Sequence, residues 1–136
     1  MGPRSAGADP GPASYGRGGK APALTDAAFL LGMLGEGKLA SGIGLDRGAA
    51  KEAFGPVAEA LSYSIEETAR GVMTIASATM ANTIREITID QGIDPRELSL
   101  LAFGGAGPLM STLLARELDV ARIIVPPHAG NFSAWG

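Results

Sequence analysis

Cysteine is absent from this sequence, and histidine and tryptophan occur once each among its 136 residues. Without cysteine there can be no disulfide framework, no thiolate zinc site and no cysteine nucleophile. The single histidine, His128, follows two prolines and has no second ligand at metal-binding spacing, which favours a loop position over a catalytic one. The sequence therefore predicts no metal site.

Long apolar runs and clustered positive charges are lacking as well. No stretch of about 18 apolar residues is present, so no bilayer-spanning helix is expected. The 11 Lys and Arg residues are scattered and the net charge is −3, which argues against nucleic-acid binding. Residues 1–12 lack a basic start followed by an apolar stretch, so no secretory signal is predicted and a cytoplasmic location is expected.

Glycine and proline are abundant instead, with 20 and 9 occurrences, but they follow no period of three, which excludes a collagen-like chain. They are concentrated in residues 1–22, a glycine-rich loop without helical or strand periodicity. Composition leaves open whether this loop is a disordered linker or a functional element. Because 46% of the sequence is hydrophobic and 18% charged, we expect a soluble globular chain of at most one compact domain.

The following residues, 23–92, are expected to be mostly helical. Thr25 or Asp26 can cap a short helix over 27–34. Asp46 can cap a second helix over 47–61. Proline in the sequence Gly55-Pro56 removes a backbone donor in the middle of that second helix, so we expect a kink or a break there.

A third, longer helix begins at Ser64, where Ser64 and Glu67 match a capping box, and it should end near Gly92. Apolar residues recur at spacings of three or four and predict one buried stripe, formed by Ile65, Ala69, Val72, Ala76, Met80, Ile84 and Ile87. Further apolar residues beside the stripe suggest burial on more than one side. Asn82 and Arg85 interrupt the pattern and need partners, for which an interdomain hydrogen bond and a ligand contact both remain open.

One βαβ unit is expected over residues 93–125. A short apolar run over 98–103 is typical of a buried strand, 109–118 has helical spacing, and 121–125 is a second apolar run. A crossover of this kind joins parallel strands. The fold class is therefore α/β and helix-rich, and residues 126–136 form a tail without regular structure that looks cut rather than finished.

The strongest local motif is the glycine turn between that first strand and its helix, formed by Gly104, Gly105, Ala106 and Gly107. Glycines allow a ligand to approach the backbone, and free N–H groups at a helix start favour a nucleotide, although a tight packing turn remains an alternative. Met110 stands where a dinucleotide fingerprint needs its third glycine, and no P-loop is present. Asp9 and Asp26 are weak catalytic candidates, since an aspartate beside a loop more often caps a turn or a helix.

Four sequence blocks make the chain resemble the hydantoinase/oxoprolinase family, specifically its ATP-dependent hydantoinase A-type subunit, which also occurs in acetone carboxylase-type enzymes. The blocks are GPRSAGADPGPASYGRGG (2–19), LTDA (24–27), AFGGAGP (102–108) and VPPHAGNFSA (125–134). Their order and spacing fit the family, and together they cover essentially the whole chain.

The resemblance implies a partial hydantoinase A-type domain, a fragment of an actin/hexokinase/Hsp70-like (RNase H-like) ATPase domain. In that fold Gly104, Gly105, Ala106 and Gly107 would contact the adenosine side of ATP. With ATP and Mg²⁺ the intact enzyme would phosphorylate a carbonyl oxygen and so hydrolyse a cyclic amide of the hydantoin or oxoproline type. A hydantoinase B-type subunit or domain is the implied partner, and the glycine-rich phosphate motifs of the family are absent from this chain.

Two residues depart from the family pattern, because Ser14 stands where Cys is usual and Met110 where His is usual. If those residues serve substrate or metal binding in the family, this chain has changed that role. Two alternatives stay open: a ketone carboxylase-type subunit of the same family, and a non-catalytic helical assembly module built on the long helix.

Overall fold

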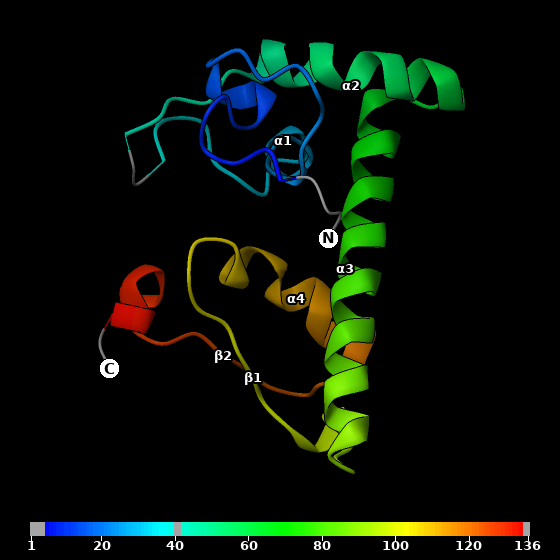
Figure 1. Ribbon diagram of the computed structural model, residues 1–136, viewed down its shortest axis with the longest axis vertical. Coiled ribbons are helices and arrows are strands. Elements are labelled where there is room, and N and C mark those ends of the chain that lie inside the picture. The colour runs from blue at the N-terminus through cyan, green and yellow to red at the C-terminus, as the bar shows by residue number, and fades with distance from the viewer. Residues whose placement is uncertain (1–4, 40–41, 135–136) are drawn as a thin grey trace. The chain divides into compact units, whose positions relative to one another are not determined.

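The computed structural model describes residues 5–39 and 42–134 (Figure 1). The chain divides into two compact units, residues 1–75 and 76–136. Helices dominate both, and the longest helix runs through the boundary between them. No helix in the described ranges is long and apolar enough to cross a membrane.

The first unit packs the glycine-rich loop against two helices. The loop contains a 3₁₀ turn, η1 (Ala13–Tyr15), which contacts both α1 (Leu24–Leu30) and α2 (Arg47–Leu61). Phe29 of α1 and Phe54 of α2 are the largest fully buried apolar side chains here. Residues 11–14 of the loop are buried, so this part of the chain is a packed element and not a disordered linker.

Helix α1 begins and ends earlier than the 27–34 span that the sequence suggested. Its N-cap residue is Ala23, and Asp26 is its third residue, not its cap. The Asp26 carboxylate reaches back to accept the N–H of Ala23 at 2.8 Å, which lets the helix start at Leu24. Glycine at position 32 has a φ of +72°, a conformation that ends the helical turn.

Helix α2 confirms the predicted cap but not the predicted break. Asp46 accepts the N–H of Ala49 at 3.0 Å, as expected of an N-cap aspartate. The helix then continues without interruption past Pro56 to Leu61. Pro56 and Glu52 are both exposed, so the Glu52 carbonyl that loses its donor can bind water instead.

Helix α3 (Ile65–Asp90) starts at the capping box that the sequence predicts, but its buried face differs from the predicted stripe. The buried face consists of small or polar residues and one methionine, namely Thr68, Ala69, Met73, Ala76, Ser77, Ala81 and Thr88. Ile75, Ile87 and Ile89 are exposed, at 69%, 55% and 66%. Of the predicted stripe, Ala69 and Ala76 are buried, Ile65, Val72, Met80 and Ile84 are half-buried, and Ile87 is exposed, so the stripe is confirmed only in part. Met73 and Ala81, which lie beside the stripe, are buried as well.

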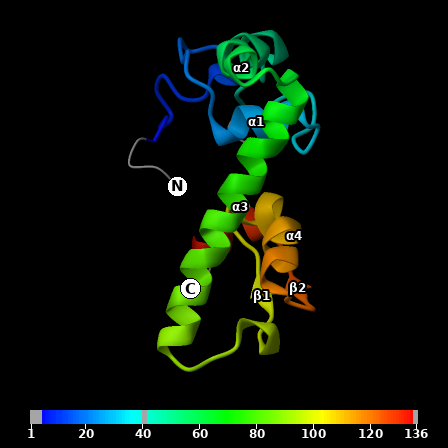
Figure 2. The ribbon, with the colours of Figure 1, turned by 90° about the vertical axis from the view of Figure 1, so that its right-hand side faces the viewer.

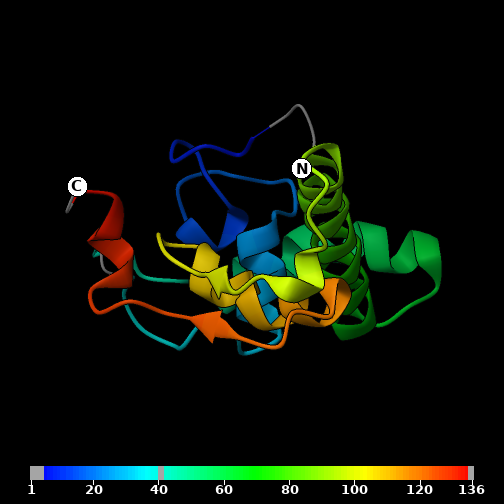
Figure 3. The same cartoon turned by 90° about the horizontal axis from the view of Figure 1, so that it is seen from below.

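The second unit contains the βαβ element. Strands β1 (Leu100–Leu101) and β2 (Ile123–Ile124) pair in parallel, with Leu100 opposite Ile123, and α4 (Gly107–Leu118) forms the crossover (Figures 2 and 3). Helix α4 contacts β2 and supplies most of this unit's core through Met110, Leu114, Ala115 and Leu118. The predicted βαβ unit is confirmed, with shorter strands and a helix that starts two residues earlier.

The last described segment is more regular than the unstructured tail that the sequence suggested. Residues Ala129–Ala134 form a 3₁₀ helix, η3. The ring of Phe132 lies 5.5 Å from the ring of Phe103, centroid to centroid, at a tilted angle. This aromatic pair holds η3 against the end of β1.

Candidate functional site

The glycine turn joins the end of β1 to the start of α4 in the second unit. Gly104 has a φ of +79°, which an L side chain rarely adopts. Its N–H donates to the carbonyl oxygen of Ala129 at 2.8 Å, so the turn is anchored to η3. Ala102, just before the turn, donates to Ile124 of the neighbouring strand at 2.8 Å. The backbone of the turn is therefore fixed from two sides.

The middle of the turn is open on its outer side. Gly105 and Ala106 are exposed, and a Cβ added to Gly105 would meet no atom within 4 Å. Within residues 5–39 and 42–134, the N–H groups of Gly105 and Ala106 donate to no oxygen. They lie at the N-terminus of the 12-residue helix α4, where the helix dipole favours negative charge. The turn can therefore donate hydrogen bonds to a polar ligand that approaches its backbone.

Sequence reasoning missed the contribution of the tail to this turn. Ala129 and Phe132 contact the turn region through the backbone hydrogen bond and the aromatic pair described above. The block VPPHAGNFSA carried a sequence pattern, but no periodicity from which a contact could be deduced. His128 in this block is exposed with a φ of +56°, which is a loop position.

Asp26 occupies a structural position in the first unit. Its side chain is fully buried, and Oδ1 accepts the N–H of Ser14 at 2.8 Å. Its Oδ2 accepts the N–H groups of Ala13 at 3.2 Å and Ala23 at 2.8 Å. With both oxygens engaged by backbone donors, Asp26 ties the glycine-rich loop to the start of α1. Asp9 lies exposed in a turn of the same loop.

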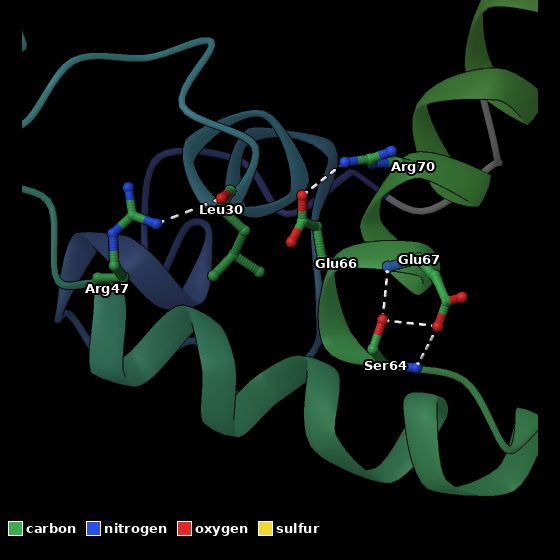
Figure 4. Close-up of polar contacts among 6 residues, drawn as sticks. All are labelled: Leu30, Arg47, Ser64, Glu66, Glu67 and Arg70. Carbon is green, nitrogen blue, oxygen red and sulfur yellow. Dashed lines mark hydrogen bonds and ion pairs between the residues drawn. The ribbon is translucent and has the colours of Figure 1, made fainter.

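Arg47, at the start of α2, caps the other end of α1. Its guanidinium donates to the carbonyl oxygen of Leu30 at 3.2 Å (Figure 4). It also donates to the carbonyl oxygen of Phe29 at 3.3 Å and lies 5.0 Å from the centre of the Phe29 ring. A cation at a helix C-terminus is favoured by the helix dipole. Arg47 therefore fixes the angle between α1 and α2, and no catalytic role follows from its contacts.

The carboxylates at the start of α3 also serve structure. Ser64 Oγ and the Ser64 N–H both donate to Glu67, at 2.6 and 2.8 Å, and these hydrogen bonds lower the pKa of Glu67 (Figure 4). Glu66 pairs with Arg70 at 2.6 Å on the exposed face. In the described part of the chain no three His, Cys, Asp or Glu side chains gather as a metal site.

The two polar residues that interrupt α3 have partners inside the second unit. The Arg85 guanidinium donates to Asn82 Oδ1 at 2.9 Å and to the carbonyl oxygen of Glu117 in α4. The observed hydrogen bonds lie within one unit and join α3 to α4, so they are not the interdomain hydrogen bond that the sequence left open.

The two positions that depart from the family pattern are both buried. Ser14 lies in η1 and its Oγ is enclosed with no hydrogen-bond partner in the described structure. Met110 is 1% exposed on the inner face of α4. Because both side chains are buried in the described structure, neither is exposed for contact with a ligand, and Met110 fills the apolar core.

Comparison with known proteins places these features in a family. The family model described as Hydantoinase/oxoprolinase matches residues 1–136. Caprolactamase subunit alpha of Pseudomonas jessenii is 41% identical over 100% of this chain and 20% of its own length. 5-Oxoprolinase 1 of Arabidopsis thaliana is 35% identical over 100% of this chain and 12% of its own length.

Solved structures agree with the sequence relatives. The crystal structure of the ATP-dependent caprolactamase from Pseudomonas jessenii matches 98% of this chain and 20% of that chain, with a TM-score of 0.90 and 40% identity. A nucleotide-free structure of acetone carboxylase matches 98% of this chain and 19% of that chain, with a TM-score of 0.87 and 29% identity. The chain thus spans about a fifth of the caprolactamase chain. By sequence and by fold, this chain belongs to the hydantoinase/oxoprolinase family.

Proposed function

We propose that this chain is part of an ATP-dependent enzyme that hydrolyses a cyclic amide of the hydantoin or oxoproline type. In that reaction, phosphorylation of the amide carbonyl oxygen makes the ring carbon open to attack by water. The observation that carries the proposal is the glycine turn, with its fixed backbone and its free N–H groups at the start of α4. Two relatives support the proposal by their names, the ATP-dependent caprolactamase and 5-oxoprolinase 1.

The turn fits a nucleotide better than it fits a metal. Gly104, Gly105, Ala106 and Gly107 present backbone without a bulky side chain, and Gly105 leaves open space for a ligand surface. We assign them to the adenosine side of ATP, in an actin/hexokinase/Hsp70-like fold. The described residues supply no cluster of carboxylates for Mg²⁺, so its ligands would come from other parts of the intact enzyme.

Phosphoryl transfer depends on positioning and on charge stabilisation, with little covalent chemistry for the protein to supply. When bound, ATP would provide the phosphoryl group for the carbonyl oxygen. The contribution of this chain would be to hold the nucleoside at a backbone that Gly104 and Ala129 keep rigid. A rigid binding surface lowers the entropic cost of placing the reacting groups.

Two further candidates have specific support. The match to acetone carboxylase supports a ketone carboxylase-type subunit, in which the activated carbonyl compound would be carboxylated. The exposed isoleucines of α3 support an assembly role, in which they would contact a B-type partner subunit. The relative from Pseudomonas jessenii is named as subunit alpha of caprolactamase, and we propose that this protein also assembles with a partner subunit.

The first experiment compares Gly105→Val with Gly104→Val in the intact enzyme. Gly105 has no positive φ and no neighbour at its Cβ position, so valine should leave the fold unchanged and block the approach of the nucleotide. We expect ATP affinity to fall at least about tenfold with an unchanged melting temperature, since the ligand loses contact with the turn. Gly104→Val should instead lower the melting temperature, because its φ of +79° excludes a β-branched residue.

Melting temperature and ATP affinity are measured together, by calorimetry and by equilibrium binding. Unchanged ATP affinity in a folded Gly105→Val enzyme would remove the glycine turn from the nucleotide site. Activity assays then separate the two reactions. Hydantoin and a lactam test for ring opening, and acetone with bicarbonate tests for carboxylation.

A further inference from the structure

The 3₁₀ helix η3 is attached to the second unit at the entrance of the glycine turn. None of its residues, Ala129–Ala134, is buried. The Gly104 N–H donates to the Ala129 carbonyl oxygen at 2.8 Å. The ring of Phe132 lies 5.5 Å from the ring of Phe103 at an angle of 53°. Both contacts therefore end on the two consecutive residues that lead into the turn.

An element attached in this way has a low local stability. A segment that buries little apolar surface lies at the low end of the range of local unfolding free energies. The chain also enters η3 through His128, whose φ of +56° is uncommon for a residue other than glycine. Holding this conformation costs free energy and opposes the docking of η3. We therefore expect η3 to leave the turn more readily than α4 leaves its place beside β2.

The contact with η3 restrains the part of the turn that has the most conformational freedom. Gly104 and Gly105 follow each other, and two adjacent glycines sample many backbone conformations. The hydrogen bond from Ala102 to Ile124 fixes the end of β1, but it lies before these glycines. Without the hydrogen bond to Ala129, the free N–H of Gly105 would point in varied directions. A ligand would then have to order the turn as it binds, which lowers its affinity.

We propose that the docking of η3 on the glycine turn is coupled to nucleotide binding, and that Phe132 is the positioning residue of this coupling. The proposal rests on the proposed function, in which the turn contacts the nucleotide, and it adds a segment that acts through the turn. Coupling between two binding equilibria is reciprocal. A docked η3 therefore raises the affinity for ATP by presenting an ordered turn, and bound ATP holds η3 in place.

The first experiment measures ATP affinity and melting temperature in variants of the full-length enzyme. Phe132→Ala removes the ring pair, so the Kd for ATP should rise about fivefold, the effect of losing one aromatic pair. Phe132→Tyr keeps the ring and should stay within about twofold of the parent. Leu98→Ala is the control, because Leu98 is an exposed side chain before the other end of β1, and its Kd should equal that of the parent. Because η3 has no buried residue, the melting temperature without ATP should be the same in all three variants.

The second experiment follows amide hydrogen exchange of the full-length enzyme with and without ATP, in the peptide that contains residues 129–134. In the parent, ATP should slow the exchange of this peptide, because the bound nucleotide holds η3 on the turn. In Phe132→Ala the peptide should exchange faster, and ATP should slow it less. A ring that only adds to the local structure of the tail would change the exchange rate and leave the response to ATP unchanged, which would refute the coupling.

Gly105→Val separates this inference from the proposed function. If Gly105→Val leaves the affinity for ATP unchanged, the turn lies outside the nucleotide site, and both the assignment of the turn and this inference fail. If Gly105→Val weakens ATP binding but Phe132→Ala does not, the proposed function stands and η3 is not coupled to it. A raised Kd in Phe132→Ala, with Phe132→Tyr and Leu98→Ala like the parent and with η3 protected by ATP, supports the coupling.

Discussion

At the scale of single residues, Asp26 shows how a carboxylate near a glycine-rich loop can be structural. Its two oxygens accept hydrogen bonds from three backbone N–H groups, those of Ala13 and Ser14 in the glycine-rich loop and that of Ala23 before α1. Sequence reasoning weighed this residue as a weak catalytic candidate against a capping role. The hydrogen bonds present are structural: Asp26 is the third residue of α1 and not its cap, and it accepts the N–H of the N-cap residue Ala23 together with those of Ala13 and Ser14.

We predict that Asp26→Asn lowers the free energy of unfolding by about 2–3 kcal/mol. The amide nitrogen of Asn would replace one accepting oxygen, so a buried backbone N–H would face another donor and lose its hydrogen bond. Asp46→Asn is the control, since Asn caps a helix about as well as Asp and this site is exposed. Urea unfolding of both variants checks the difference. Equal losses in the two would contradict the assigned role of Asp26.

A second residue-scale prediction concerns Ser14, whose enclosed Oγ has no partner in the described structure. Ser14→Ala removes a buried polar group that pays a desolvation cost, so stability should stay constant or rise by up to about 1 kcal/mol. Ser111→Ala is the contrasting variant, because Ser111 Oγ donates to the Pro108 carbonyl at 2.8 Å, and it should lose about 1 kcal/mol. Thermal unfolding measures the stability of both variants. A clear loss of stability in Ser14→Ala would contradict the prediction and mean that Ser14 Oγ makes a hydrogen bond.

At the scale of elements, the caps of α2 and α3 were predictable, whereas the ends of α1 and the full buried face of α3 were not. Caps act through residues close in sequence, so the Asp46 cap and the Ser64–Glu67 capping box could be read directly. Burial depends on distant neighbours. Thr68 and Thr88 can be buried because their hydroxyls donate to the carbonyl oxygens of Ser64 and Ile84, four residues earlier, and no apolar pattern reveals this.

The glycine turn illustrates the same division within the candidate site. The local sequence pattern predicted that the turn lies between a strand and a helix, and in the structure it lies between β1 and α4. Its anchor at Ala129, 25 positions after Gly104, needs a long-range contact that periodicity does not encode. The partners of Asp26 at Ala13 and Ser14 were unpredictable for the same reason.

The capping box of α3 leads to a prediction about pH. The hydrogen bonds from Ser64 lower the pKa of Glu67 below its ordinary value of 4.5. The stabilising effect is therefore complete above pH 4.5 and is lost as the pH falls through the lowered pKa. Ser64→Ala should raise the pKa of Glu67 toward 4.5, as followed by NMR of the side-chain carboxyl.

Asp94 is the internal control in that titration, because hydrogen bonds from Arg96 hold its pKa at about 2 independently of Ser64. Its pKa should be the same in the parent and in Ser64→Ala. An unchanged pKa for Glu67 would mean that the capping box does not persist in solution.

At the scale of the whole molecule, the chain carries one proposed contact with a nucleotide and spans about a fifth of the caprolactamase chain. We predict that residues 1–136 alone do not hydrolyse ATP, because no phosphate motif and, in the described residues, no metal cluster would position the transferred group. A phosphate-release assay with the full-length enzyme as the positive control checks this. Turnover by the short chain that disappears in Gly105→Val would contradict it.

The parallel pair of strands in the second unit has a consequence for handling the protein. Leu101 and Ile124 are 43% and 50% exposed, and in the described residues β1 and β2 pair only with each other. Each strand is only two residues long, which limits pairing with another chain, but its outer backbone groups lie beside an exposed apolar side chain. A lysine at position 101 or 124 would place a charge on that edge and act as a gatekeeper, which makes these two positions the first choice for keeping a recombinant short chain monodisperse.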